Sequence, residues 1–277
     1  AFFFNNDKKS SLASKKPLLA GVVFQNKLGT LLDKTNRVAA LAKELSIRMG
    51  ANSKIVVRAA ELSKCDLVSE MVLEFPEMQG IAGAHYARHD GEPEEVANAI
   101  QSHYKPRFAG DSLPSTPEAT ALALADRLDT LVGIFGIGQP PTGSRDPFAL
   151  RRASLAIVRM LMEIKQISPL PELVDLACSC HESHLLREDT RPKVTEYMIG
   201  RLTGFYEDQS IHISIVRAAL ASADTDFHDL NLRIRALASF AGTDNAGGLA
   251  ASNKRVANIL SKTKILWDQE PNPQFFL

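Results

Sequence analysis

STPEATALALADRLDTLVGIFGIGQPPTGSRDPFALRR, residues 115–152, predicts two helices joined by an elbow of glycine and proline. The first helix is expected to open at Pro117, because proline is tolerated at the first position of a helix. Ser115 precedes Glu118 by three residues, the spacing of a capping box, in which two side chains satisfy free backbone N–H groups. The stretch therefore indicates an all-α core.

Helical spacing of large apolar residues predicts which face of the first helix is buried. The stripe consists of Leu124, Leu128, Leu131 and Phe135. Asp126 and Asp129 lie on a neighbouring face of the same helix. We expect Gly133, Gly136 and Gly138 to end this helix, and the two prolines that follow cannot continue it.

The second helix of the stretch has three arginines near its start. We expect it to open at Asp146, a good N-cap ahead of a proline, so Arg145, Arg151 and Arg152 crowd its N-terminus. A helix N-terminus already carries partial positive charge, so the arginines and the free N–H groups together form a potential site for an anion such as phosphate. The alternative is structural, with the arginines paired to Asp146, Glu163 or carboxylates elsewhere.

Composition favours helices and gives no sign of a membrane protein. Aromatic residues make up only 6%, and alanine and leucine dominate, which favours helices over sheets. No apolar run reaches the ~18–20 residues of a membrane span, and Phe2–Phe4 is too short for the core of a secretion signal. Three cysteines in 277 residues do not make a disulfide framework, so we expect a cytoplasmic protein.

The chain carries no net charge. Lys+Arg and Asp+Glu both count 32, whereas a protein that coats nucleic acid without specificity is usually basic. Any contact with RNA must therefore come from a local patch. One candidate is the last helical segment, which carries Lys254, Arg255, Lys262 and Lys264. A one-sided basic helix can follow a phosphate backbone, but the same pattern also suits a solvated surface.

Helical patterning predicts two domains after a short N-terminal segment. Residues 1–20 are predicted as an extended tail and linker, and residues 21–165 as a helical domain. Residues 166–277 are predicted as a second helical domain, because QISPL (166–170) interrupts the pattern. Apart from the two helices described above, the expected helices are 30–49, 53–74, 77–89, 93–105, 171–187, 193–208, 211–222, 226–241 and 245–263.

The helices of the first domain resemble in order those of HD-type metal phosphohydrolases. Such enzymes bind a metal through an early histidine, a His-Asp pair and a late aspartate, and the metal activates water for attack on a phosphate ester. Here the early position falls within Asp33-Lys34-Thr35, and the pair is Cys65-Asp66. Asp66, His103 and Asp126 remain as a degenerate set without the two defining histidines. We therefore expect His103 and Asp126 to form a buried polar pair or an RNA-facing surface.

Other clusters of metal-binding residue types lack a ligand spacing. His85, His89 and His103 lie in different predicted helices or at helix ends, which favours solvent-exposed faces. One predicted helix carries Cys178, Cys180, His181 and His184. A tetrahedral zinc site needs ligands that converge, and side chains on two turns of one helix point in different directions. The sequence therefore predicts no metal bound by this chain.

Five strings in the chain carry a resemblance to a known family: EFPEMQG (74–80), HYKPRFAGDSLP (103–114), ALADRLDTLVGIFGIG (123–138), PTGSRDPFALRR (141–152) and NKRVANIL (253–260). They resemble the beta subunit family of the bacterial two-subunit glycyl-tRNA synthetase. They occur in the family's order and extend over most of the chain. PTGSRDPFALRR is long and specific, and NKRVANIL is the main string of the second half. Because the family's subunits are much longer, the resemblance implies a fragment of the C-terminal half.

The resemblance implies an all-α fold in which an HD-like helical domain is followed by an anticodon-binding-like helical bundle, truncated at its end. In this family the alpha subunit forms glycyl-adenylate from glycine and ATP, and the beta subunit holds the tRNA. The implied partners are tRNA(Gly) and the alpha subunit, in a heterotetramer of two alpha and two beta chains. The whole enzyme is expected to use ATP and magnesium, with no cofactor on this chain.

A catalytic centre for aminoacylation is not expected here, because the G-x-x-x-x-G-K-[ST] phosphate loop is absent and no Ser/His/Asp arrangement is evident. The predicted function is to position tRNA(Gly) for glycylation elsewhere. The predicted tRNA contacts are Arg145, Arg151, Arg152, Lys254 and Arg255. Two alternatives remain open: an HD-type metal-dependent phosphohydrolase that acts on a nucleotide, and a structural module that joins subunits without touching RNA.

Overall fold

The structure, a computed structural model, describes residues 2–165, 167–221 and 226–262. Within these ranges helices predominate, and the only sheet pairs β1 (Val23–Gln25) with β2 (Gly29–Thr30) in antiparallel fashion. The predicted all-α class is confirmed. The other elements are α1 (Phe2–Asp7), the 3-10 helix η1 (Ala13–Gly21), α2 (Leu31–Arg48), α3 (Ser53–Leu62), η2 (Cys65–Val68), α4 (Glu70–Glu74), η3 (Pro76–Met78), α5 (Ile81–His89), α6 (Glu94–Ser102), α7 (Pro117–Gly136), α8 (Leu150–Glu163), α9 (Leu170–Ser179), α10 (Thr190–Glu207), α11 (Ile213–Ala221), α12 (Phe227–Ala241) and α13 (Asp244–Lys262).

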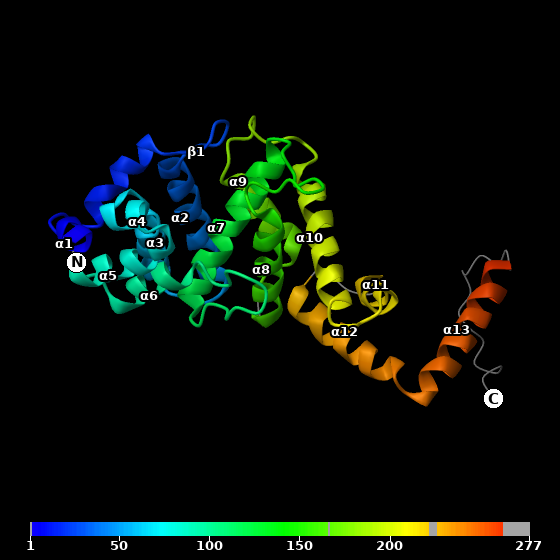
Figure 1. The fold of residues 1–277 in the computed structure, drawn as a ribbon. Coiled ribbons are helices and arrows are strands. Elements are labelled where there is room, and N and C mark those ends of the chain that lie inside the picture. The colour runs from blue at the N-terminus through cyan, green and yellow to red at the C-terminus, as the bar shows by residue number, and fades with distance from the viewer. Residues whose placement is uncertain (1, 166, 222–225, 263–277) are drawn as a thin grey trace.

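Helix α7 lies inside the main body, with α2 on one side and α8 and α10 on the other (Figure 1). Its predicted apolar stripe is buried: Leu124, Leu128 and Leu131 are fully covered, and Phe135 is 7% exposed. Burial of a large apolar side chain stabilises a fold by about 1.5–3 kcal/mol, so this stripe contributes much of the free energy that holds α7 against its neighbouring helices. None of the described helices combines the length and hydrophobicity that crossing a bilayer requires.

The start of α7 differs from the predicted capping box. Thr116, and not Ser115, is the N-cap, and its hydroxyl accepts a hydrogen bond from the backbone N–H of Ala119 at 3.2 Å. The carboxylate of Glu118 accepts instead from the backbone N–H of Asn52 at 3.1 Å. Glu118 therefore joins the start of α7 to the start of α3.

The N-terminal segment is helical, and the prediction of an extended tail over residues 1–20 is wrong for the described part. Residues 2–7 form α1 and residues 13–21 form η1. The buried carboxylate of Asp7 accepts hydrogen bonds from two backbone N–H groups at the start of α4 and from the hydroxyl of Tyr86 at 2.8 Å. The ring of Phe4 stacks on Tyr86 with centroids 5.3 Å apart. These contacts hold the segment against α4 and α5.

Residues 53–74 do not form the single helix predicted for them. The 3-10 turn η2 separates α3 from α4. Ser69 starts α4, because its hydroxyl accepts a hydrogen bond from the backbone N–H three residues later at 3.3 Å. The break places Lys64 and Asp66 inside the protein, where they are 6% and 0% exposed.

The end of α7 packs closely against the loop that precedes α10. Gly133 lies inside α7, Gly136 is its last residue, and Gly138 follows with a φ of 78°. A Cβ on Gly136 would overlap the side chain of Leu186, and the backbone N–H of Arg187 donates to the carbonyl of Gly136 at 3.0 Å. These glycines therefore permit a close approach as well as a helix end, and Gly133 does not end the helix.

The second half of the chain is also helical. Val194, Met198 and Leu202 of α10 are fully buried, and α10 packs against α7, α8 and α9. Helix α13 stands apart from the body (Figure 1), and its Leu249 is 61% exposed. The division of the chain into domains at residue 166 stays a prediction, and Gln166 itself lies outside the described residues.

Candidate functional site

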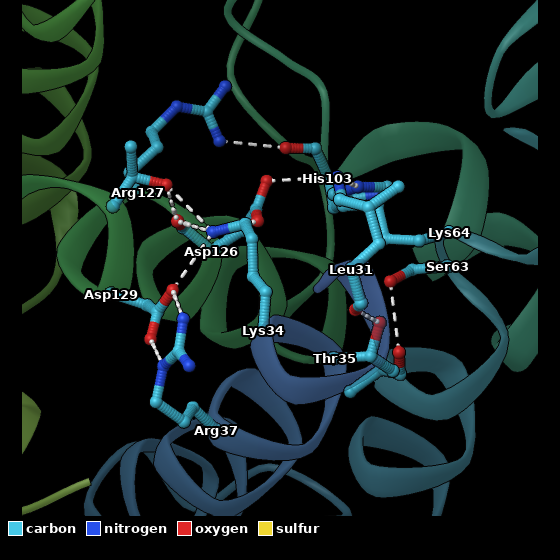
Figure 2. A network of polar contacts seen from close by, with 12 residues as sticks. Leu31, Lys34, Thr35, Arg37, Ser63, Lys64, His103, Asp126, Arg127 and Asp129 are labelled. Carbon is cyan, nitrogen blue, oxygen red and sulfur yellow. Dashed lines mark hydrogen bonds and ion pairs between the residues drawn. The ribbon is translucent and has the colours of Figure 1, made fainter. Parts of the chain in front are cut away.

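Lys34 of α2 points into a group of oxygen atoms on α7 (Figure 2). Its ammonium group lies 3.0 Å from Oδ1 of Asp126, and it donates hydrogen bonds to Oδ2 of Asp129 at 3.1 Å and to Oγ1 of Thr130 at 2.7 Å. The backbone carbonyl of Asp126 accepts a further bond at 3.0 Å. Asp126 and Asp129 are three residues apart and so share one face of α7. We call Lys34, Arg37, Lys64, His103, Asp126, Asp129 and His181 the lysine–aspartate cluster.

A second lysine reaches Asp126 from the turn after α3. The ammonium group of Lys64 lies 2.9 Å from Nε2 of His103 and 3.0 Å from Oδ2 of Asp126. Nδ1 of His103 lies 2.7 Å from the carbonyl oxygen of Ile100, which can only accept, so Nδ1 carries the proton and Nε2 accepts from Lys64. Each carboxylate oxygen of Asp126 therefore faces one ammonium group.

Arg37 and His181 complete the cluster around Asp129. Nε of Arg37 donates to Oδ1 of Asp129 at 2.7 Å. Nε2 of His181, from the segment after α9, lies 3.2 Å from the same oxygen. Gly133 makes room for this histidine, because a Cβ there would lie 2.9 Å from Cε1 of the His181 ring. The cluster therefore joins α2, α7 and the segment after α9.

Charge pairing sets the protonation states in the cluster. Burial opposes ionisation of Asp126, but Lys34 and Lys64 outweigh it and hold the pKa of this carboxyl well below its usual range. Burial likewise opposes ionisation of Asp129, and Lys34, His181 and Arg37 nevertheless lower its pKa. Burial, reinforced by the positive charge of Lys64, lowers the pKa of His103 to about 3. At neutral pH Asp126 and Asp129 are therefore carboxylates, and His103 is a neutral imidazole.

Asp66 hydrogen-bonds to a turn and not to the other two members of the degenerate HD set. Its Oδ2 accepts from the backbone N–H groups of Gly80 at 2.6 Å and Gly83 at 3.0 Å. Burial raises the pKa of Asp66 in spite of these two bonds. The side chain fixes the turn before α5, where Gly80 has a φ of 78°.

The residues at the HD-like positions do not fit a divalent metal. His103 and both oxygens of Asp126 face ammonium groups at 2.9–3.0 Å, so the two lysines take the place of a cation. Throughout residues 2–165, 167–221 and 226–262, no three His, Cys, Asp or Glu side chains are placed to hold a metal. The chemistry of this donor set is that of a buried ion-pair network.

A cleft of about 800 Å³ lies beside the cluster, between α7, the loop after α6 and the start of α8. Arg127 holds this loop in place, and Figure 2 shows its side chain turned toward it. Its guanidinium donates to the carbonyls of His103 at 2.8 Å, Tyr104 at 2.9 Å and Lys105 at 3.0 Å. Because these acceptors are neutral, the loop does not neutralise the charge of Arg127.

Helix α8 begins later than predicted. It starts at Leu150, and the carboxylate of Asp146 accepts from the backbone N–H groups of Leu150 at 2.7 Å and Arg151 at 3.0 Å. Asp146 therefore does cap the helix, but from four residues before its first turn. Because the carboxylate already uses these N–H groups, the helix start is not free to bind an external anion as predicted.

The three predicted arginines have different surroundings. Arg145 is exposed in a turn that pairs it with Thr142. The guanidinium of Arg151 donates to the carbonyl of Gly143 at 2.6 Å. Arg152 lines the cleft and makes no ion pair with any residue that the structure describes. Of the three, only Arg152 lines the cleft, and their contacts with tRNA stay predictions.

The remaining candidates do not converge either. Helix α9 ends at Ser179, well before the predicted end at 187, and the ring of His181 turns to Asp129 while His184 pairs with Glu182 at 3.5 Å on the surface. His85 and His89 are exposed as expected, whereas His103 is fully buried. Lys254 and Arg255 are exposed on α13, and Lys264 lies outside the described residues.

Sequence reasoning missed Lys34 and Lys64 as members of a site, because lysine is almost never fully buried unless it is paired. One signal was present in the sequence. Lys34 lies within the segment that matches the early HD ligand, and Lys64 directly precedes the Cys65-Asp66 pair. A lysine at or beside a metal-ligand position indicates that an ammonium group replaces the metal.

Comparison with protein families matches residues 1–221 to the family described as Glycyl-tRNA synthetase beta subunit. Among curated proteins, the glycine–tRNA ligase beta subunits of Chromohalobacter salexigens and Mannheimia succiniciproducens are 50% and 49% identical to this chain. The beta subunit of Yersinia pestis is 47% identical. The alignments cover 94–95% of this chain but 38% of each relative, so the chain spans well under half the length of these relatives.

Proposed function

Because the chain belongs to the glycyl-tRNA synthetase beta subunit family, we propose that it serves glycyl-tRNA synthesis by binding and positioning tRNA(Gly). The match of the family to residues 1–221 is the observation that carries this proposal. Activation of glycine with ATP and magnesium then takes place on an alpha subunit, in an assembly of two alpha and two beta chains. We expect this reaction in the cytoplasm, where tRNA is charged.

Unpaired cationic side chains on the surface support a contact with RNA phosphates. Arg152 and Lys105 line the cleft without an ion pair to any described residue. Lys254 and Arg255 are exposed on α13, and Arg145 is exposed in the turn before α8. Arginine and lysine at such positions neutralise phosphates and release counterions, and this term supplies much of the affinity for nucleic acid.

The lysine–aspartate cluster supports a positioning role through rigidity. It links α2, α7, the turn at Lys64 and the loop that begins at His103 by ion pairs and hydrogen bonds that are nearly all buried. A bound tRNA must be held in one register against an active site on another subunit, because a misplacement of about 1 Å can cost about a hundredfold in rate. A scaffold whose helices keep their relative positions when RNA binds would hold the tRNA in this register.

The proposal is tested by fluorescence anisotropy of labelled tRNA(Gly) titrated with the chain, alone and together with an alpha subunit, at several salt concentrations. A non-cognate tRNA serves as the comparison. We expect salt-dependent binding with a preference for tRNA(Gly). Binding to the alpha subunit without any affinity for tRNA in either arrangement would replace the proposal with the structural-module alternative.

Charge reversal locates the contact. Arg152→Glu is expected to weaken tRNA binding and to lower the salt slope by about one counterion, because one phosphate contact is lost. Arg217→Glu on α11 makes the same charge change at an exposed position without an ion pair to a described residue, and it serves as the matched control. An equal loss in both variants would show that overall charge, and not the cleft, governs binding.

A further inference from the structure

The cleft beside α7 combines free charge with free hydrogen-bonding groups. Lys105, Arg127 and Arg152 line it, and none of the three forms an ion pair with a residue in the described ranges. Arg107, which also lines it, is paired with Asp111 at 3.3 Å. The cleft therefore presents three cationic groups that have no carboxylate of this part of the chain within ion-pairing distance.

The carboxylates that line the cleft do not cancel this charge. Asp126 lines the cleft but is already bound by two ammonium groups. Glu77, the other lining carboxylate, forms no ion pair with a described residue, and its single charge leaves the three unpaired cations in excess. Burial lowers the pKa of Arg127, Asp126 opposes this effect, and the nearby charge of Arg152 adds to it. An anion between Arg127 and Arg152 would relieve this repulsion.

The walls of the cleft suit a nucleobase as well as a phosphate. Gln79 and Gln101 line it, and the side-chain amide of neither forms a hydrogen bond within the described residues. Phe148 is half-buried in the wall near the start of α8. Amide groups can pair with the edge of a base, and an aromatic ring can stack on its face. A volume of about 800 Å³ lies within the range of small-ligand sites.

We infer that this cleft binds one nucleoside monophosphate unit, with its phosphate on Arg152 and Lys105 and its base against Phe148 and the amides of Gln79 and Gln101. The inference rests on the proposed function in one respect: an unpaired nucleotide of the bound tRNA is the expected source of this unit. A free nucleotide offers the same chemistry and is distinguished by experiment. Only binding is proposed for this cleft, without a chemical step.

The test titrates the chain with the four nucleoside 5′-monophosphates and with inorganic phosphate, by isothermal calorimetry, and repeats each titration with labelled tRNA(Gly) present. We expect binding of at least one mononucleotide in the millimolar range, weaker binding of inorganic phosphate, and competition with tRNA. Arg152→Glu should reduce the affinity for the mononucleotide by about tenfold or more, because a charge-assisted contact is lost.

Two further variants separate the base from the phosphate. Gln101→Ala changes an exposed side chain, so it should fold normally, and it should weaken some bases more than others. Arg217→Glu on α11 should leave mononucleotide binding unchanged. If Gln101→Ala reduces binding of all four mononucleotides and of inorganic phosphate equally, or has no effect, the site does not bind a base and the inference fails.

The outcomes separate this inference from the proposed function. Mononucleotide binding that competes with tRNA(Gly) supports both. Mononucleotide binding without any tRNA affinity keeps the cleft as a nucleotide site, assigns it to a free nucleotide and overturns the proposed function. Affinity for tRNA without binding or competition by mononucleotides, or equal affinity for inorganic phosphate, overturns the inference and leaves the proposed function standing.

Discussion

The ammonium group of Lys64 lies 2.9 Å from Nε2 of His103, so a histidine nitrogen of the kind that binds metals accepts a hydrogen bond from a lysine instead. Lys64 also contacts Oδ2 of Asp126, and Lys34 contacts the other carboxylate oxygen, Oδ1, at 3.0 Å. Buried carboxylates need a compensating positive charge, and here two tethered ammonium groups supply it. The cluster therefore connects α2, α7 and the turn at Lys64 by buried ion pairs.

Replacement of Lys34 by methionine should strongly destabilise the fold. Met keeps much of the aliphatic volume but leaves Asp126 and Asp129 without one of their cations, and breaking a buried ion pair costs about 3–5 kcal/mol. The free energy of unfolding from urea denaturation measures the effect. Lys43→Met, at an exposed position of the same helix, is the control and should change stability by less than about 0.5 kcal/mol. If both variants lost a similar amount of unfolding free energy, the conclusion that the cluster stabilises the fold would be wrong.

Stability should fall as the pH is lowered from 6.5 toward 4.5, and His103 should cause part of this fall. Its pKa is about 3 in the folded protein, against about 6.5 for an unfolded chain, so the unfolded state binds the proton first and is favoured as the pH drops. The full slope for one proton is about 1.4 kcal/mol per pH unit. Urea denaturation at several pH values should give a flatter profile for His103→Gln, while His85→Gln, an exposed histidine, should leave the profile unchanged. The pKa values of Asp126 and Asp129 are depressed in the folded protein, so their contribution to the free energy of unfolding also falls as the pH is lowered. This loss begins only near pH 4, the pKa of an aspartate in the unfolded chain.

Manganese or zinc should not stabilise this part of the chain. A ligand that binds the folded state raises the unfolding temperature, and the cluster offers a metal no open position beside its two ammonium groups. Thermal unfolding followed by circular dichroism, with added metal and then with a chelator, should give the same midpoint. A rise with metal that disappears in Asp126→Asn would revive the HD-type phosphohydrolase.

Gly136→Ala should destabilise the protein, whereas Gly200→Ala should not. A Cβ at residue 136 overlaps Leu186, and overpacking of this kind costs about 1–3 kcal/mol. Gly200 is exposed within α10, and a Cβ there meets no atom within 4 Å. Since alanine is the better helix former, Gly200→Ala should stabilise by up to about 1 kcal/mol. Equal effects in denaturant unfolding would mean that the loop before α10 can move away from α7.

Periodicity predicted the helical fold well where the apolar stripe is long. The stripe on α7 and the helix α2 agree with the sequence prediction, because many buried positions repeat the same signal. Short polar turns carry a weaker signal. Residues 53–74 contain enough apolar residues for one helix, but the hydroxyl of Ser69 starts a new one. The sequence also could not show that Thr116, and not Ser115, is the N-cap. Serine and threonine are both good N-cap residues, so the choice between two neighbours depends on the local backbone geometry.

The site was less predictable than the fold. His103 and Asp126 were identifiable from the order of the helices, and the structure does bring them together through Lys64. The arginines near α8 were grouped because they are close in sequence, but Asp146 uses the helix start and only Arg152 lines the cleft. Arg127 holds the wall of the cleft by hydrogen bonds to carbonyls of a loop that is distant in sequence. The periodicity of its helix predicts burial but not such contacts, so the sequence did not reveal this role.

The hydrogen bonds of Arg127 have a consequence for the kinetics of binding. The loop from His103 to Lys105 is held in its place by one guanidinium before any ligand arrives. The loop is therefore already in place when a ligand binds, and association requires no slow ordering of it. The rate of association should then follow diffusion and charge attraction, with a strong dependence on ionic strength. Differences in affinity among related ligands should arise almost entirely from how quickly each one leaves.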